Sequence, residues 1–214
     1  MLCLYLFTFA AVPLSAASYL GGAKPPANCA QPIKFPKGKS EEIVKKINER
    51  RRVMVEGNQR NGKSGLNLPT GENVMEMEWN CDLERKAMAA LGGTCPTQSP
   101  SAPSGTTGFF DYKDVGIERD SLNLWLSEIE NDNIVLYENR EAPVKYNGVN
   151  KNYCNLVRYD ASQIGCAATE CGGKRSLFCL IDRPPLRNGD VVRVEALKEA
   201  VIILVQNHAV ESPA

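Results

Sequence analysis

The chain has 214 residues, and its 25 Lys and Arg residues balance 25 Asp and Glu residues. This length suits one domain with an ordinary buried core. Because the charges cancel and no strongly basic stretch is visible, neither nucleic acid nor an anionic membrane surface is indicated as a partner.

The first 17 residues form an apolar run that ends in the small residues Ser15, Ala16 and Ala17. This pattern is typical of a signal peptide that is cleaved during secretion, although no Lys or Arg precedes the apolar run. An uncleaved membrane anchor is the alternative, but the run is short for a membrane span and Pro13 interrupts it. We therefore expect a secreted, extracellular protein without a membrane span.

Residues 18–39 contain several prolines, which predicts an extended lead-in. A helix is expected to follow, because apolar residues then recur at near-helical spacing. Ser40 and the acidic residues after it suit the start of this helix, and Gly57 or Asn58 suits its end.

Residues 57–64 read GNQRNGKS and match the phosphate-binding motif G-x-x-x-x-G-K-[ST] letter for letter. That motif works only as a loop between a buried strand and a helix, where backbone N–H groups hold the phosphates. Here a charged amphipathic helix precedes the motif, and glycines and Pro69 follow it, so no helix can start at Lys63 and continue. The sequence instead predicts a turn at Asn61-Gly62 in a surface loop.

A second helix is predicted in CDLERKAMAALGG, because Leu83, Ala87 and Leu91 share one face. Gly92-Gly93 would end this helix. The next segment, PTQSPSAPSGTTG from Pro96 to Gly108, has the composition of a mobile loop.

A third helix is predicted over residues 117–132, with Ile117 and other apolar residues facing inward. Asp120 or Ser121 would cap its N-terminus. The residues from Tyr153 to Asp182 are then expected to form a β region.

Seven cysteines remain once the predicted signal peptide and its Cys3 are removed. In a secreted chain such a set indicates a disulfide framework with one thiol left over. A zinc site built from the last three cysteines is the competing interpretation, but no C-x-x-C pair occurs and the compartment would be oxidising. The seven are Cys29, Cys81, Cys95, Cys154, Cys166, Cys171 and Cys179.

One disulfide follows from spacing within the β region. If Gly172-Gly173 is the two-residue loop of a hairpin, Cys171 faces Lys174 and Cys166 faces Cys179. Ladder alternation makes the second of these a non-hydrogen-bonded pair, whose short Cα separation suits a disulfide. We therefore predict a bond between Cys166 and Cys179.

Few residues can carry catalysis. His208 is the single histidine, so one chain cannot build a metal site from several histidines, and any Ser-His-Asp triad must use this residue. Carboxylate chemistry stays open, from the acidic cluster over residues 76–84 or from Glu128 with Glu130. Nothing in the spacing of these acids separates a protonated carboxyl from an ionised one, however, and solvated helix faces account for most acidic residues.

Four stretches of sequence, taken in chain order, carry a family resemblance. They are INERRRVMVEGN, LPTGENVMEMEWNCDLERKAMAAL, WLSEIEND and NYCNLVRYDASQIGCAATEC. Together they resemble the CAP superfamily of cysteine-rich secretory, antigen-5 and pathogenesis-related proteins, and within it the activation-associated secreted proteins of parasitic nematodes. The resemblance covers about residues 29–183. It implies an α/β fold, a three-layer α/β/α sandwich around a mostly antiparallel sheet, stabilised by disulfides.

With this resemblance the chain divides into a signal peptide (1–17), the lead-in (18–39), a divergent CAP domain (40–183) and a C-terminal extension (184–214). The extension contains the apolar segment AVIILV at residues 200–205. Six residues cannot cross a bilayer, so we expect a strand or helix that docks on the core.

The family carries two histidines and two glutamates in a cleft, and this chain departs from that set. KNYCNLVRY stands where the family has GHYTQ-x-VW, so Asn152 replaces a histidine and Arg158 a tryptophan. The other histidine position falls near Ser99, the first glutamate falls in TGFFDYKD, and only Glu128 in WLSEI matches. A degenerate cleft of Ser99, Glu128 and Asn152 should hold no zinc, other divalent metal or cofactor, because the neutral imidazoles are missing.

The resemblance also implies two further disulfides, Cys95 to Cys171 and Cys29 to Cys81. Cys154 stands at a family threonine and is the unpaired thiol. It could be buried and inert or could bridge to a partner, and burial is favoured because the surrounding segment reads as an apolar strand.

Function is expected to lie in binding, without enzymatic activity. The resemblance implies a protein that a parasite releases and that contacts host proteins or cell-surface receptors. The loop from Pro96 to Phe110 and the cleft edge near Asn152 and Arg158 are candidate surfaces, because loops on a rigid scaffold usually carry recognition. A lipid or sterol carrier, which requires an apolar pocket, and a hydrolase that uses Glu128 and a second acid are the alternatives.

Overall fold

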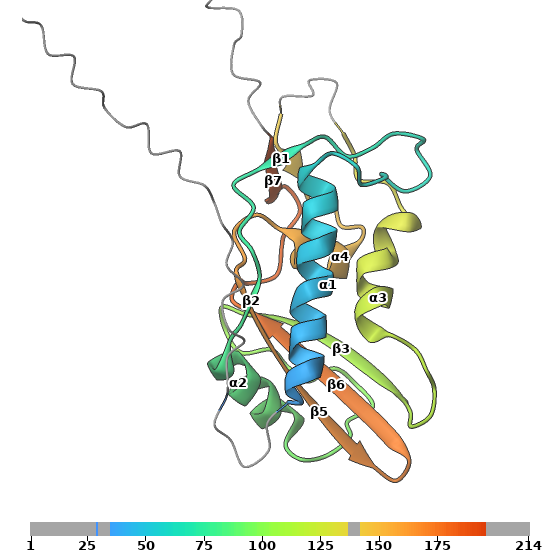
Figure 1. Ribbon diagram of the computed structural model, residues 1–214, viewed down its shortest axis with the longest axis vertical. Coiled ribbons are helices and arrows are strands. Elements are labelled where there is room, and N and C mark those ends of the chain that lie inside the picture. Colours follow the sequence, from blue (N-terminus) through green and yellow to red (C-terminus); the bar gives the residue numbers. More distant parts are fainter. Residues whose placement is uncertain (1–28, 30–34, 137–141, 196–214) are drawn as a thin grey trace, which may run out of the picture.

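The computed structural model describes Cys29 and residues 35–136 and 142–195 (Figure 1). The predicted signal peptide, segment 200–205 and His208 lie outside the described residues. In chain order the elements are α1 (Lys37–Val55), β1 (Gly71–Glu72), β2 (Glu78–Trp79), α2 (Cys81–Leu91), β3 (Thr107–Asp114), α3 (Ser121–Leu126), the 3-10 helix η1 (Ser127–Glu130), β4 (Val144–Lys145), α4 (Lys151–Val157), β5 (Gln163–Cys171), β6 (Lys174–Ile181) and β7 (Val191–Glu195).

A four-stranded sheet in the order β2-β5-β6-β3 forms the centre of the fold. The short strand β2 runs parallel to β5, and the other neighbours are antiparallel. The β5–β6 hairpin turns at Gly172-Gly173 and places Cys166 opposite Cys179, the register expected from the spacing. Their sulfur atoms are bonded and their Cα atoms lie 4.0 Å apart.

Helices cover both faces of this sheet, as Figure 1 shows. On one face α2 packs on β5 and β6 around a small apolar cluster that includes Ala87 and Phe178. On the other face α1, α3 and α4 enclose a larger cluster that includes Ile47, Trp125 and Tyr153. The expected three-layer α/β/α sandwich with a mostly antiparallel sheet is confirmed.

A second, three-stranded sheet in the order β1-β7-β4 lies at the end of the molecule where α1 finishes (Figure 1). Its central strand β7 comes from residues that the sequence analysis assigned to an extension. Leu186 and Val192 from the same region belong to the main core, and so do Phe35 and Cys29 from the expected lead-in. Residues on both sides of the 40–183 range are therefore part of the folded structure.

The two longest helices end where glycine permits a left-handed backbone. Gly57, with φ of 72°, follows α1, and Gly92, with φ of 62°, caps α2. The start of α1 differs from the prediction, because the helix begins at Lys37 and Ser40 lies one turn inside it. The Ser40 hydroxyl donates to the carbonyl oxygen of Lys37, three residues earlier in the same helix, at 2.7 Å, and it does not cap the helix.

Two segments differ in kind from the prediction. Tyr153 to Val157, expected as strand, form most of the helix α4 and are buried on all sides. A short apolar run that is buried all round has no periodicity that separates helix from strand, which explains the error. Thr107 to Asp114, expected in part as loop, form strand β3 along β6.

The third helix is also shorter than expected. It comprises α3 and η1 only, and Asp120 caps it by accepting from the N–H groups of Leu122 and Asn123 at 3.0 and 3.2 Å. Ile117 was expected to face inward but is 49% exposed, because it precedes the helix.

A buried arginine connects α1 to the segments around it. Arg51 is 3% exposed, and its guanidinium donates to the carbonyl oxygens of Leu156, Met75 and Ala161. Burial lowers the pKa of Arg51 to about 10, so the group stays charged at neutral pH. One side chain therefore holds the end of α4, the approach to β2 and the approach to β5.

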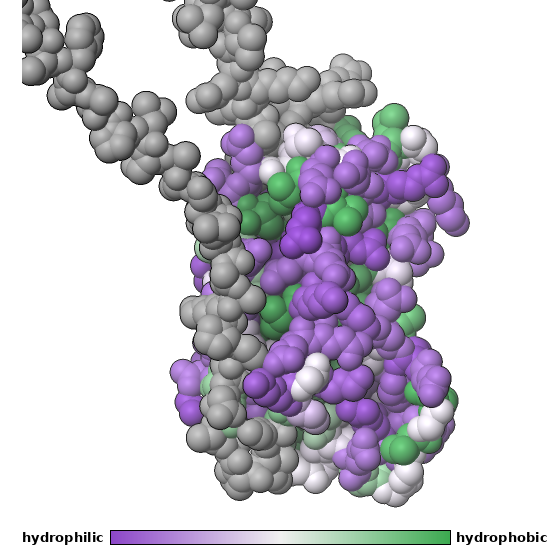
Figure 2. Space-filling model, viewed as in Figure 1, coloured by the Kyte–Doolittle hydropathy of each residue, from purple (hydrophilic) through white to green (hydrophobic). Residues whose placement is uncertain are grey.

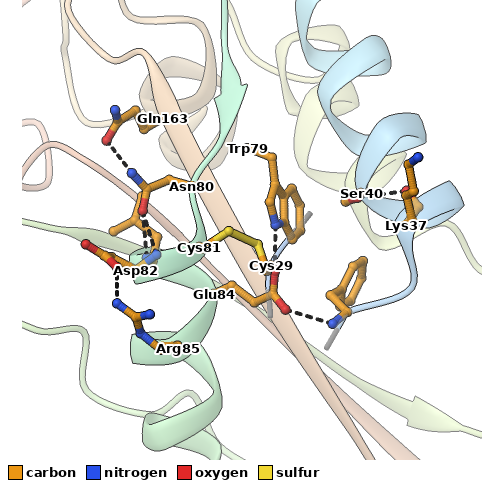
Figure 3. The surroundings of a disulfide bond; sticks show 12 residues. Cys29, Lys37, Ser40, Trp79, Asn80, Cys81, Asp82, Glu84, Arg85 and Gln163 are labelled. Carbon is orange, nitrogen blue, oxygen red and sulfur yellow. Dashed lines mark hydrogen bonds and ion pairs between the residues drawn. A yellow bond between two sulfur atoms is a disulfide. The ribbon is translucent and has the colours of Figure 1, made fainter. Parts of the chain in front are cut away.

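The start of the described chain is fixed against α2, as Figure 3 shows. A disulfide joins Cys29 to Cys81, the first residue of α2. The buried carboxylate of Glu84 accepts from the Phe35 N–H at 2.8 Å and from the Trp79 indole N–H at 2.7 Å. The rings of Phe35 and Trp79 stack with centroids 5.3 Å apart.

The third disulfide joins Cys95 to Cys171 at the tip of the β5–β6 hairpin, so all three bonds are the expected pairs. Cys154 is a free, buried cysteine, on helix α4 instead of the expected strand.

Within the described part of the chain, no helix combines the length and apolarity that a membrane crossing needs.

Candidate functional site

Two of the predicted cleft residues meet at the start of α4. The Glu128 carboxylate accepts from the side-chain amide of Asn152 at 2.6 Å. It also accepts from the backbone N–H groups of Asn152 and Tyr153 at 2.7 and 3.1 Å. Both carboxylate oxygens are therefore occupied by N–H donors, and Glu128 satisfies N–H groups that the helix itself leaves unpaired.

The third predicted cleft residue belongs elsewhere. Ser99 is exposed, and its hydroxyl donates to the carbonyl oxygen of Pro100 at 3.2 Å. Its loop packs on the α2 face of the sheet, because Ala102 lies against the smaller cluster. Glu128 and Asn152 lie on the opposite face, so the described contacts bring those two together without Ser99.

The predicted cleft edge at Arg158 is also closed. Arg158 is 7% exposed, and it pairs with the Asp160 carboxylate at 2.6 Å and donates to the carbonyl oxygen of Pro184 at 2.7 Å. Arg158 fixes the chain after α4 and is not available to a partner.

The segment TGFFDYKD, where the first family glutamate was expected to fall, forms strand β3. Its buried Phe109 ring packs on Trp125 with centroids 5.6 Å apart.

A groove of about 320 Å³ lies between α1, α3 and strands β3 and β6. Its floor includes the apolar residues Ile43, Leu122 and Trp125, but nine of its lining residues are charged. The face of α1 beside it is mostly hydrophilic (Figure 2). The charged residues are Lys39, Glu42, Lys46, Asp111, Lys113, Glu118, Arg119, Asp120 and Arg175.

Lys46 ties the two helices beside this groove. Its ammonium group lies 2.7 Å from a carboxylate oxygen of Glu42 and 2.7 Å from one of Asp120. The hydrogen bonds from Lys46 and then Lys39 lower the pKa of Glu42 to about 2, and those to Asp120 and then Glu42 raise the pKa of Lys46. The tie is therefore complete at neutral pH.

We expect this tie to weaken in acid. The ordinary pKa of Glu42 is 4.5 and its folded value is about 2, so its contribution is full above pH 4.5 and is lost as the pH falls towards 2. Thermal unfolding at low salt should show Lys46→Met less stable than the parent at pH 6, with the gap closing by pH 2. Because these groups are partly exposed, high salt should shrink the gap too. A gap of constant size would contradict the assignment.

The chain also matches a family model. The model of the cysteine-rich secretory protein (CAP) family matches residues 44–181, more than half of the chain. The chain belongs to the CAP family. In this CAP domain the side-chain amide of Asn152 holds Glu128, the expected cleft glutamate.

One sequence relative is a hookworm protein. The chain is 29% identical over 103 residues to hookworm platelet inhibitor 1 of Ancylostoma caninum, a match that spans 48% of each protein. Na-ASP-1 superposes with a TM-score of 0.67 at 17% identity, covering 79% of this chain and 42% of that one. The hookworm platelet inhibitor structure gives 0.55 at 21% identity, covering 78% and 81%.

A zinc-bound CAP structure, NaASP2, superposes with a TM-score of 0.65 at 15% identity, covering 78% of this chain and 90% of that one. The expected cleft residues Glu128 and Asn152 of this CAP domain do not fit a metal ion. Asn152 offers its amide N–H to Glu128, and Glu128 accepts at both oxygens. The described residues contain no group of three or more His, Cys, Asp or Glu side chains that could hold a metal ion.

The GNQRNGKS letters form a structural loop in this CAP domain. Asn61 is buried, and its side chain exchanges two hydrogen bonds with the backbone of Ile134, at 2.7 and 2.8 Å. The Lys63 N–H donates to the Asn133 side chain at 2.8 Å and is not free for a phosphate. The predicted turn is present, since Ser64 N–H donates to Asn61 O, but Asn61 itself is buried.

We expect Asn61→Ala to destabilise the protein by about 2–3 kcal/mol, because it leaves the Ile134 N–H and C=O buried without partners. Chemical denaturation of the oxidised protein measures this loss. Lys63→Ala in the same loop is the matched control. Its denaturation midpoint should equal that of the parent, because the Lys63 side chain is exposed. Equal midpoints for the two variants would show that the loop is not held through Asn61.

Proposed function

We propose that this CAP protein is secreted and acts by binding a host protein or cell-surface receptor, without catalysing a reaction. The observation that carries the proposal is the hydrogen bonding of Glu128. The Glu128 carboxylate, the glutamate that the family resemblance assigns to the cleft, accepts three N–H donors and supports the start of α4. A carboxylate in this role is poorly placed to act as acid, base or metal ligand.

The relatives support a host-directed role. The sequence match is to a protein whose name describes inhibition of platelets, and this chain covers about half of that protein's length. The disulfide framework suits an oxidising extracellular compartment. Zinc, other divalent metals and cofactors have no part in the proposed activity.

Binding to host material tests the proposal. The oxidised full-length protein, labelled at one engineered tag, is incubated with platelets, leukocytes and plasma proteins of a vertebrate host. We expect saturable binding to one of these, displaced by excess unlabelled protein. The reduced and alkylated protein is the control and should not compete. Absence of saturable binding to all three would overturn the proposal.

The variant Glu128→Gln separates binding from hydrolysis. A hydrolase that depends on the carboxylate would lose its activity in this variant, whereas a binding protein should keep its affinity for the captured partner. The free energy of unfolding is measured alongside, because Glu128 also stabilises α4. Turnover of an ester, peptide or glycoside substrate by the parent and not by the variant would contradict a purely binding role.

A lipid carrier is a second candidate because the floor of the groove beside α1 is apolar. Charged residues surround that floor, and Lys46 pairs there with Glu42 and Asp120. Such a lining disfavours binding of an extended alkyl chain. Organic extraction of the purified protein followed by mass spectrometry decides the matter. One lipid per protein would favour the carrier over the host-binding proposal.

A further inference from the structure

The loop between α2 and β3 is fixed to the central hairpin at its beginning. Cys95 is bonded to Cys171 at the end of β5. The Ser176 hydroxyl donates to the carbonyl oxygen of Pro96 at 3.0 Å, and the Thr169 hydroxyl donates to that of Thr94 at 2.5 Å. The segment expected to be mobile is therefore held on the rigid sheet.

The same loop is fixed at its other end. The Thr106 hydroxyl donates to the carbonyl oxygen of Pro103 at 2.6 Å, and the Thr107 hydroxyl donates to that of Arg183 at 2.8 Å. Both threonines are buried, at 6% and 2% exposure. Ala102 packs against the smaller apolar cluster and holds the middle of the loop on the sheet.

Between these anchors, four hydroxyl side chains are exposed. The backbone there has no helix and no strand, and Pro100 and Pro103 restrict it further. Ser99 makes one weak hydrogen bond, to the carbonyl oxygen of the residue that follows it. The four exposed residues are Thr97, Ser99, Ser101 and Ser104.

Exposed Ser and Thr interleaved with Pro are typical of segments that carry O-linked sugars. An acceptor hydroxyl must be reachable by a transferase, and an extended backbone free of ladder hydrogen bonds lets the enzyme bind the segment. The four exposed residues are accessible and lie outside any ladder, whereas Thr106 and Thr107 are buried and Thr107 also pairs in β3. The loop thus contains candidate acceptors and internal negative controls within eleven residues.

We infer that Thr97, Ser99, Ser101 and Ser104 are acceptor sites for O-linked glycosylation. In this step the hydroxyl oxygen bonds to the anomeric carbon of a nucleotide-activated sugar. The bond from that carbon to the phosphate oxygen breaks, the nucleoside diphosphate leaves, and the hydroxyl proton passes to a base of the transferase. The inference rests on the proposed passage through the secretory pathway, where such donors are used.

The glycans would cover one end of the molecule. The loop lies on the α2 face of the sheet beside the tip of the β5–β6 hairpin, whereas Glu128 and the groove between α1 and α3 lie on the opposite face. Partner binding at the α1 face would therefore remain possible. The sequence has no Asn-x-Ser or Asn-x-Thr triplet, so sugar found on the protein is not attributable to the usual N-linked acceptor.

The test expresses the full chain in secreting animal cells in two forms, one with its own first 17 residues and one with those residues replaced by an established signal peptide. Intact mass spectrometry of reduced protein from the medium should show added hexosamine and hexose. Fragmentation of the peptide from Ala87 to Lys113 should place the sugar on the four exposed residues and leave Thr106 and Thr107 unmodified.

A variant with Thr97→Val, Ser99→Ala, Ser101→Ala and Ser104→Ala should be secreted at the parent level and lose the added mass completely. Protein in the medium without sugar on the loop would overturn the inference and leave secretion intact. If only the form with the replaced signal peptide reaches the medium, the proposed secretion fails, and the sugar content of that form still decides the inference. Sugar located on Thr106 or Thr107 would show that exposure does not select the sites.

Discussion

Replacing Arg51 with methionine is expected to destabilise the protein by about 3–5 kcal/mol, enough to prevent accumulation of folded protein at 37 °C. The variant keeps most of the side-chain volume but leaves the carbonyl oxygens of Leu156, Met75 and Ala161 without their donors. Those carbonyls belong to three segments that meet around α1. Denaturant unfolding of the oxidised protein, monitored by tryptophan fluorescence, measures the loss.

The neighbouring residue provides the control. Arg52 is exposed on the same helix, so Arg52→Met should change the free energy of unfolding by at most about 0.5 kcal/mol. Arg51→Lys retains the charge but cannot reach three carbonyl groups at once. Its free energy of unfolding should lie between those of Arg51→Met and Arg52→Met. If Arg51→Met and Arg52→Met have the same free energy of unfolding, the buried guanidinium does not join these segments.

Gly165→Ala is expected to prevent folding or to cost more than about 4 kcal/mol. A Cβ at this position in β5 would lie 2.6 Å from the carbonyl oxygen of Asn80 and 2.7 Å from the carbonyl carbon of Leu83. Both atoms belong to the backbone at the start of α2, which cannot yield as a side chain can. The helix would have to leave the sheet, so we expect little soluble monomer with all three disulfides formed.

The same substitution in α1 should act in the opposite direction. A Cβ on Gly38 meets no atom within 4 Å, and Gly38 lies inside the helix. Gly38→Ala should stabilise the protein by about 0.5 kcal/mol, because alanine has less freedom in the unfolded chain. Comparing the yield and the unfolding midpoint of the two variants isolates the contact between α2 and β5. Parent-like behaviour of Gly165→Ala would contradict the close approach.

The features that the sequence predicted well have local causes. Gly172-Gly173 fixes the hairpin register, and two-residue alternation then sets Cys166 against Cys179 without other information. The end of α2 follows from Gly92, because glycine adopts the left-handed backbone of a helix C-terminus without strain. In each case a few neighbouring residues determine the geometry.

The features that it missed depend on contacts between distant residues. Thr107 to Asp114 become a strand because β6, which begins at Lys174, offers a partner over the whole length. Glu84 looked like a solvated helix acid, but the Trp79 indole and the Phe35 N–H bury it. Periodicity within one segment cannot show either partner.

One missed feature did leave a signal. Arg51 lies four residues after Ile47 and three before Met54, so it occupies the same helical stripe as these two buried residues. A charged residue on an apolar stripe indicates a buried, fully hydrogen-bonded group. The pairing of Glu128 with Asn152 could be located only through the family resemblance, because the two residues are 24 positions apart and neither has a distinctive local pattern.

The enclosed thiol of Cys154 has a consequence for the lifetime of the oxidised protein. Burial, and then the nearby charge of Glu128, raises the pKa of Cys154 to about 12, so almost none of it is thiolate at neutral pH. Thiolate is the species that attacks disulfides. Within the described part of the chain, the one free thiol is therefore a poor nucleophile towards the three disulfides, and we expect their pairing to stay unchanged in the folded protein at neutral pH.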